Sequence, residues 1–148
     1  MEKMVLTGFL LTAAWQDLRR QEVDAWVFGL FGALGVVLAV YRWLVPGETY
    51  ALLEHGAGIA LGLALLGICR LSRGGMGIGD GCFFLVSGVL LGFWENVALL
   101  CYGTLCCGLY CLCWFVWGSL RGRRDLREKT VPFLPFVALP GIWLVWGL

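Results

Sequence analysis

The sequence has few charged residues, and this shortage excludes most soluble classes of protein. Of its 148 residues, 14% are charged and 60% are hydrophobic, whereas a soluble globular domain carries about 25% charged residues. A composition this poor in charge indicates a polytopic membrane protein. The net charge of +1 identifies no partner by itself. The partner that the composition predicts is the lipid bilayer, and we expect no nucleic acid.

Metal-binding residues are also scarce. His55 is the only histidine, which excludes a metal site built from histidines. The seven cysteines form no Cys-x-x-Cys pair, so zinc-ribbon and thioredoxin-like patterns are absent. Five of them lie in one apolar run between positions 101 and 113, where we interpret them as small buried hydrophobic residues, with redox sensing or lipidation as alternatives. We therefore predict no metal and no cofactor.

Long apolar stretches, in contrast, are abundant. Charged or polar breaks divide the chain into six apolar segments, at residues 4–16, 25–45, 50–69, 81–94, 97–118 and 131–148. The second, third and fifth have the roughly 20 residues that a helix needs to cross about 30 Å of hydrocarbon, and the first and fourth are shorter. We predict an all-α membrane protein, a single domain over residues 1–148 with about six transmembrane helices.

The boundary between the fourth and fifth segments depends only on Glu95 and Asn96. We interpret Glu95 as the mark of an external turn. Without a break there, residues 81–118 would form one helix of about 57 Å, which is too long for a bilayer.

Six crossings distribute the basic residues unevenly between the two faces of the membrane. One face receives nine of them, and the other receives only Lys3 and Arg42. The nine are Arg19, Arg20, Arg70, Arg73, Arg121, Arg123, Arg124, Arg127 and Lys129. Because Lys and Arg near the ends of spans favour the cytoplasmic side, we predict that the nine-residue face is cytoplasmic and that both termini lie outside. The predicted location is the bacterial cytoplasmic (inner) membrane.

A glycine-dense turn at residues 74–81 places Asp80 at the start of the fourth segment. A carboxylate at bilayer depth costs roughly 2.5–3.5 kcal/mol, and glycines give up helix propensity and side-chain packing. The predicted topology puts Asp17, at the end of the first segment, on the same face. Two facing carboxyls about 3 Å apart cannot both ionise, so they share a proton. The ionised one can activate water while the protonated one polarises a peptide carbonyl.

A purely structural role for these carboxyls is the alternative. Asp80 could cap the N-terminus of the fourth helix, and Asp17 could pair with Arg19 or Arg20. Asp24 is a third acidic candidate, which we interpret as the cap of the second helix. The glycine turn contains no GxGxxG pattern and no following GK[ST], which argues against a phosphate site. The residues alone leave the catalytic and structural interpretations open.

Three landmarks occur in order along the chain. They are Asp17-Leu18-Arg19-Arg20, the run Gly74-Gly75-Met76-Gly77-Ile78-Gly79-Asp80, and Val131–Leu139, which contains Pro132-Phe133-Leu134-Pro135-Phe136. Together they resemble the type IV prepilin peptidases, membrane aspartyl proteases with a GxGD motif and a PFxPF-type segment that opens the last span.

The resemblance implies an activity and a set of site residues. Asp17 and Asp80 would form the catalytic pair, cleaving leader peptides from prepilin-like or pseudopilin-like protein substrates at the cytoplasmic face. The glycines of the motif would shape the loop around Asp80, and residues of the PFxPF-type segment would contact substrate or pack near the site. The motif glycines in question are Gly75, Gly77 and Gly79. The residues of the PFxPF-type segment are Pro132, Phe133 and Pro135.

The chain also departs from the family pattern close to the pair. Many relatives read GDxK, whereas Gly81 and Cys82 follow Asp80 here, and Val23-Asp24-Ala25 replaces an Ile-Pro-Asn-type start of the second span. These departures motivate an alternative function, a catalytically inactive peptidase-like scaffold in pilus or secretion-system assembly. A proton- or solute-conducting bundle is disfavoured, since both aspartates lie on one face. Nothing matches the Cys-rich segment of the larger relatives, so no methyltransferase activity is assigned, and no oligomeric state is predicted.

Overall fold

The computed structural model describes residues 2–44, 49–72, 77–121 and 131–147. Within these ranges the chain forms six α-helices and no strand. The helices are α1 (Glu2–Arg20), α2 (Ala25–Trp43), α3 (Thr49–Leu71), α4 (Ile78–Leu91), α5 (Phe93–Leu120) and α6 (Leu134–Gly147). The predicted all-α bundle of six helices is confirmed.

Three of these helices are long and apolar enough to cross a membrane. They include Ala25–Arg42, Leu53–Leu71 and Phe93–Leu120, which correspond to the three long segments found in the sequence. Their outward surfaces are apolar, as Val37 and Leu63, both exposed, illustrate. A helix satisfies its own backbone hydrogen bonds and can therefore present such a surface to lipid. The chain is a membrane protein.

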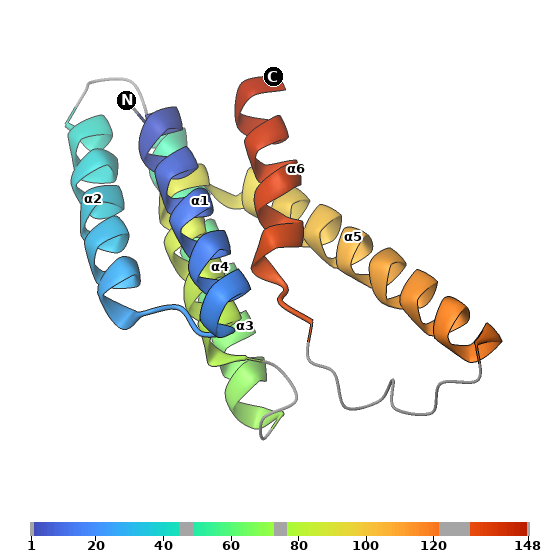
Figure 1. Ribbon diagram of the computed structural model, residues 1–148. Helices are drawn as coiled ribbons and strands as arrows, with labels where there is room; N and C mark the ends of the chain where they lie inside the picture. The colour runs from blue at the N-terminus through green and yellow to red at the C-terminus, as the bar shows by residue number, and fades with distance from the viewer. Residues whose placement is uncertain (1, 45–48, 73–76, 122–130, 148) are drawn as a thin grey trace.

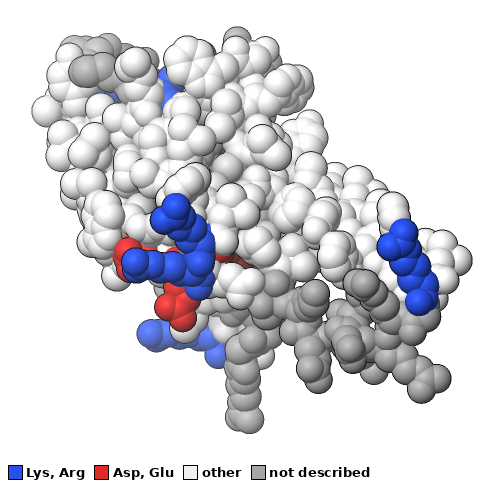
Figure 2. Space-filling model, viewed as in Figure 1, with Lys and Arg blue, Asp and Glu red and all other residues white. Residues whose placement is uncertain are grey.

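The helices alternate in direction, so the two ends of the chain lie at the same end of the bundle (Figure 1). The C-terminal ends of α1, α3 and α5 lie at the opposite end, which gathers Arg19, Arg20, Arg70 and Arg121 there. Figure 2 shows basic and acidic side chains close together at this end. The arrangement agrees with an even number of crossings, and the cytoplasmic assignment of this face stays a prediction. Five of the predicted basic residues lie outside the described ranges, namely Arg73, Arg123, Arg124, Arg127 and Lys129.

The break between α4 and α5 lies at Gly92, earlier than the sequence indicated. Gly92 has φ of +90°, a conformation that residues with a side chain rarely adopt. Glu95 lies in the first turn of α5, so its prediction as an external turn was wrong. Asn96 is fully buried, where its amide donates to the Phe84 carbonyl at 3.0 Å and its Oδ1 accepts from the Ser87 hydroxyl at 2.7 Å. A polar residue that satisfies its hydrogen bonds inside the bundle does not mark a turn.

Small residues allow α3 and α4 to pack backbone against backbone. A Cβ atom added to Gly58 would lie 2.6 Å from the carbonyl oxygen of Gly88, and one added to Gly62 would meet the backbone of Leu85. Glycines spaced four residues apart let membrane helices approach this closely. This contact anchors α4, which carries Asp80.

Aromatic rings join α1, α4 and the segment before α6. Phe9 stacks on Phe83 with ring centroids 5.0 Å apart. Phe84 meets the edge of Phe83 at 5.3 Å and lies 6.4 Å from the ring of Phe133. Such pairs contribute about 0.5–1.5 kcal/mol each beyond their buried area. They hold together the three parts of the chain in which the sequence landmarks occur.

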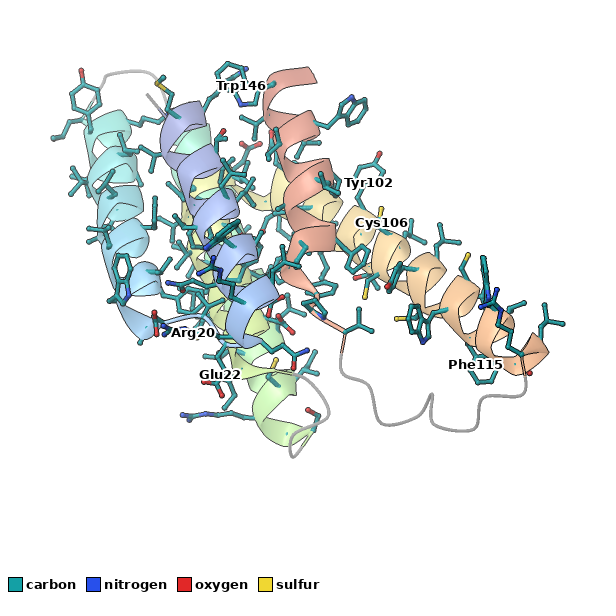
Figure 3. All side chains as sticks on the ribbon, viewed as in Figure 1. Arg20, Glu22, Tyr102, Cys106, Phe115 and Trp146 are labelled. Atoms are coloured by element: carbon teal, nitrogen blue, oxygen red, sulfur yellow. The ribbon has the colours of Figure 1, made fainter. Side chains whose placement is uncertain are left out.

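The second half of α5 diverges from the other helices (Figure 1). Figure 3 labels Cys106 and Phe115 on this helix, and both side chains are exposed. Four of the five cysteines of the run are exposed on it, namely Cys101, Cys106, Cys111 and Cys113. The prediction that these cysteines are buried within the protein was therefore wrong, because among the described residues no other helix covers these four side chains.

Candidate active site

A cavity of about 440 Å³ lies where α1 ends and α4 begins. Three separate stretches of the chain line it, and each contains one of the sequence landmarks. The lining residues are Asp17, Gln21, Glu22 and Val23, then Gly77, Ile78, Gly79 and Asp80, and finally Val131, Pro132, Phe133 and Leu134. Figure 3 shows Arg20 and Glu22 at this end of the bundle. The cavity thus brings together both aspartates and the start of the last helix.

Asp17 lies in the last turn of α1, and only 8% of its surface is exposed. Its Oδ2 accepts a hydrogen bond from the backbone N–H of Leu134 at 2.9 Å. Leu134 is the first residue of α6, and the first N–H groups of a helix have no partner within it. Arg19, which the structural alternative paired with Asp17, instead lies over the Trp15 ring at 4.8 Å. Asp17 therefore joins α1 to the beginning of α6.

Asp80 lies in the first turn of α4, three residues after the N-cap residue Gly77. Its backbone N–H donates to the Gly77 carbonyl at 3.1 Å. The interpretation of Asp80 as the N-cap was therefore wrong. Its carboxyl is available for another role.

The glycines of the motif leave room beside this carboxyl. A Cβ atom at Gly77 would lie 3.4 Å from Oδ2 of Asp80, and one at Gly79 would meet no described atom within 4 Å. Both glycines line the cavity. Gly75, the third glycine predicted to shape this loop, lies outside the described residues.

The two carboxyls interact electrostatically. Asp17 directly follows the apolar segment 4–16, and Asp80 directly precedes the apolar segment 81–94. Neither residue belongs to the three helices that are long enough to span a membrane. Burial raises the pKa of Asp80 to about 6, and the charge of Asp17 adds to the rise. Burial also raises the pKa of Asp17, while the backbone N–H groups of Leu134 and Phe133 oppose this rise. Two carboxyls that interact in this way titrate as a pair and suit general acid–base chemistry.

The remaining predicted residues separate into two groups. Pro132 and Phe133 line the cavity, whereas Pro135 is not among its lining residues. Pro135 is the second residue of α6, where a missing N–H breaks no helical hydrogen bond.

Asp24 occupies the N-cap position of α2 without a side-chain cap hydrogen bond. Its Oδ2 instead accepts hydrogen bonds from Gln16 at 3.2 Å and Trp26 at 3.3 Å. Asp24 is exposed and is not among the residues that line the cavity. It is therefore the natural control for the two aspartates that line it.

Three contributors to this site could not be identified from the sequence. Gln21 and Glu22 line the cavity, and their only signal was their position directly after the helix that carries Asp17. The Leu134 N–H was missed because a backbone donor has no residue type to reveal it. No group of three or more His, Cys, Asp or Glu residues within the described ranges could hold a metal ion.

Residues 4–112 match the model of a protein family described as the type IV leader peptidase family. The match covers more than half of the chain and includes Asp17 and the Gly77–Asp80 motif, but it ends before α6. No curated protein and no solved structure matches the chain.

Proposed function

Because the chain belongs to the type IV leader peptidase family, we propose that it is a membrane aspartyl endopeptidase. It removes leader peptides from prepilin-like or pseudopilin-like precursors at the cytoplasmic face of the bacterial inner membrane. Family membership supports a peptidase in general. The observation that supports the aspartic type is the cavity in which Asp17 and Asp80 lie with the start of α6.

The proposed reaction needs the two carboxyls and one water molecule. The ionised carboxyl takes a proton from water while the water oxygen bonds to the scissile carbonyl carbon, and the protonated carboxyl gives its proton to the carbonyl oxygen. The first carboxyl then passes its new proton to the amide nitrogen. As the carbon–nitrogen bond breaks, the second carboxyl regains a proton from a hydroxyl of the intermediate. Both carboxyls return to their starting states.

The position of the cavity suits a substrate that is itself anchored in the membrane. The apolar stem of a precursor can lie in lipid against the exposed helices while its leader reaches the cavity from the water. Holding the stem in this way fixes the scissile bond near the carboxyls, and such positioning can supply several kcal/mol of the barrier (of order 7–11 kcal/mol in the best oriented cases). The glycines beside Asp80 leave space for an extended peptide backbone.

An inactive scaffold in pilus or secretion-system assembly is the second candidate. The observation that favours it is Cys82, which stands where many relatives carry a Lys and is only half-buried beside the site. The second departure from the family pattern is Val23-Asp24-Ala25 at the start of the second span, and its Val23 lines the cavity. The two candidates differ in one measurable property, which is cleavage by the wild-type protein.

The test is cleavage of a purified type IV prepilin reconstituted in liposomes with the protein. Leader removal is followed by gel mobility and by mass spectrometry of the new N-terminus. Asp17→Ala and Asp80→Ala should each lower the rate by about 100-fold or more, because general acid–base catalysis contributes about 10²–10⁴-fold. Asp24→Ala should retain most of the activity, since Asp24 lies outside the cavity. Undiminished cleavage by folded Asp80→Ala contradicts the mechanism, and an inert wild type supports the scaffold.

A further inference from the structure

The two aspartates have different hydrogen-bonding environments. The Leu134 N–H donates to Asp17 at 2.9 Å, and the Phe133 N–H also acts on this carboxyl. Among the described residues, none donates a hydrogen bond to the carboxyl of Asp80. Asp80 lies in the first turn of α4, where its own backbone N–H donates to the Gly77 carbonyl and not to a carboxyl. The pair is therefore asymmetric.

The start of α6 favours negative charge on Asp17. A hydrogen bond donated to a carboxylate favours its ionised form, and the N–H groups at the start of α6, which have no partner within the helix, supply such bonds to Asp17. The position of α6 is fixed independently, since Phe133 packs against Phe84 of α4 at 6.4 Å. The segment that donates to Asp17 is thus held by contact with the helix that carries Asp80.

Building on the proposed peptidase function, we propose that the N-terminus of α6 keeps Asp17 as the ionised member of the pair. Asp17 then takes the proton from water, and Asp80 gives its proton to the scissile carbonyl oxygen. In the second step Asp17 passes the proton to the leaving nitrogen, and Asp80 regains one from the intermediate. Leu134 is a positioning residue that acts through its backbone N–H.

The charged and titratable neighbours of the pair do not reverse this order. Glu22 lines the same cavity as Asp17 and Asp80, and Cys107 of α5 interacts with Asp80. Each of these groups bears either no charge or a negative one, so none of them favours ionisation of a carboxyl. Burial raises the pKa of both aspartates, and among the described residues backbone N–H groups oppose the rise at Asp17 alone.

The order of ionisation can be measured without a substrate. The chain contains four aspartates, so the carboxyl carbons of ¹³C-labelled Asp can be followed individually by NMR, with Asp17→Asn and Asp80→Asn used for assignment. Asp17 should lose its proton at a lower pH than Asp80. The reverse order, or simultaneous ionisation, overturns the proposal. This result is independent of cleavage, so an inert wild type would defeat the proposed function alone.

Two substitutions at one position isolate the backbone donor. Leu134→Pro removes the N–H at the first position of a helix, where proline is well tolerated. Leu134→Ala shortens the same buried side chain and keeps the N–H. The midpoint of Asp17 titration should rise by about one pH unit or more in Leu134→Pro and stay near wild type in Leu134→Ala, and the acidic limb of the cleavage profile should move with it. Equal shifts in both variants contradict the proposal. If Leu134→Pro does not fold, the wild-type titration still decides.

Discussion

Replacing Asp80 by Asn should stabilise the folded protein at neutral pH while abolishing cleavage. Burial and the charge of Asp17 raise the pKa of Asp80 from 3.8 to about 6. The folded state therefore binds this proton more tightly than the unfolded chain does. The resulting contribution to stability is fully present below pH 3.8 and is lost as the pH rises through about 6. Asparagine has nearly the same shape and carries no charge, so it removes this cost.

The size of the effect follows from the same shift. A change of one pKa unit corresponds to about 1.4 kcal/mol, so a rise from 3.8 to about 6 corresponds to at most about 3 kcal/mol. Water at the cavity screens part of this energy. We expect Asp80→Asn to gain about 1–2 kcal/mol above pH 6, which is a rise of about 3–6 °C in melting temperature for a chain of this length.

Thermal unfolding in detergent provides the assay, with the eight tryptophans as the fluorescent probe. Asp80→Asn should melt at a higher temperature than wild type near pH 8 and at the same temperature at a pH below about 4. Asp24→Asn is the matched control, because Asp24 is exposed and does not line the cavity. Its effect should be small at both pH values. A loss of stability near pH 8, or an equal gain at low pH, would refute the reasoning.

Three further predictions concern the same site and its supports. The cleavage rate should fall as the pH rises through the pKa of Asp80, about 6, because the proposed proton donor is then ionised. Initial cleavage rates measured across the pH range check this prediction, and a rate that keeps rising to pH 9 contradicts it. Gly77→Ala should lower kcat about tenfold, because the new Cβ would lie 3.4 Å from Oδ2 of Asp80 and narrow the path by which water approaches that carboxyl. The melting temperature should be unchanged. Gly79→Ala is the comparison, since its Cβ would meet no described atom within 4 Å. Gly92→Ala should destabilise the fold by about 1–2 kcal/mol, since φ of +90° strains any residue with a Cβ atom. Unfolding measurements check this prediction. A melting temperature equal to that of the wild type would show that the break between α4 and α5 does not depend on glycine.

Much of the fold was predictable because it depends on local properties of the chain. The length of an apolar run decides whether a helix can cross a bilayer, and the runs of residues 25–45, 50–69 and 97–118 are read directly from the sequence. Counting six crossings was enough to place Asp17 and Asp80 at the same end of the bundle. The exact helix boundaries were less predictable, as Gly92 illustrates. Glu95 and Asn96 look like a polar interruption, but Asn96 is buried because Ser87, on the preceding helix, binds it.

By itself, therefore, the sequence determined the membrane class, the number of helices and the two candidate carboxyls, since residue type and spacing carry that information. Only the tertiary structure decided how the carboxyls differ. The donor to Asp17 is a backbone N–H that lies 117 positions away along the chain, and any residue except proline would supply the same group. Its effect arises because Phe133 packs on α4 and brings the start of α6 to the end of α1. Burial and hydrogen bonding between distant segments set the acidity of a carboxyl, and neither can be read from the residues next to it.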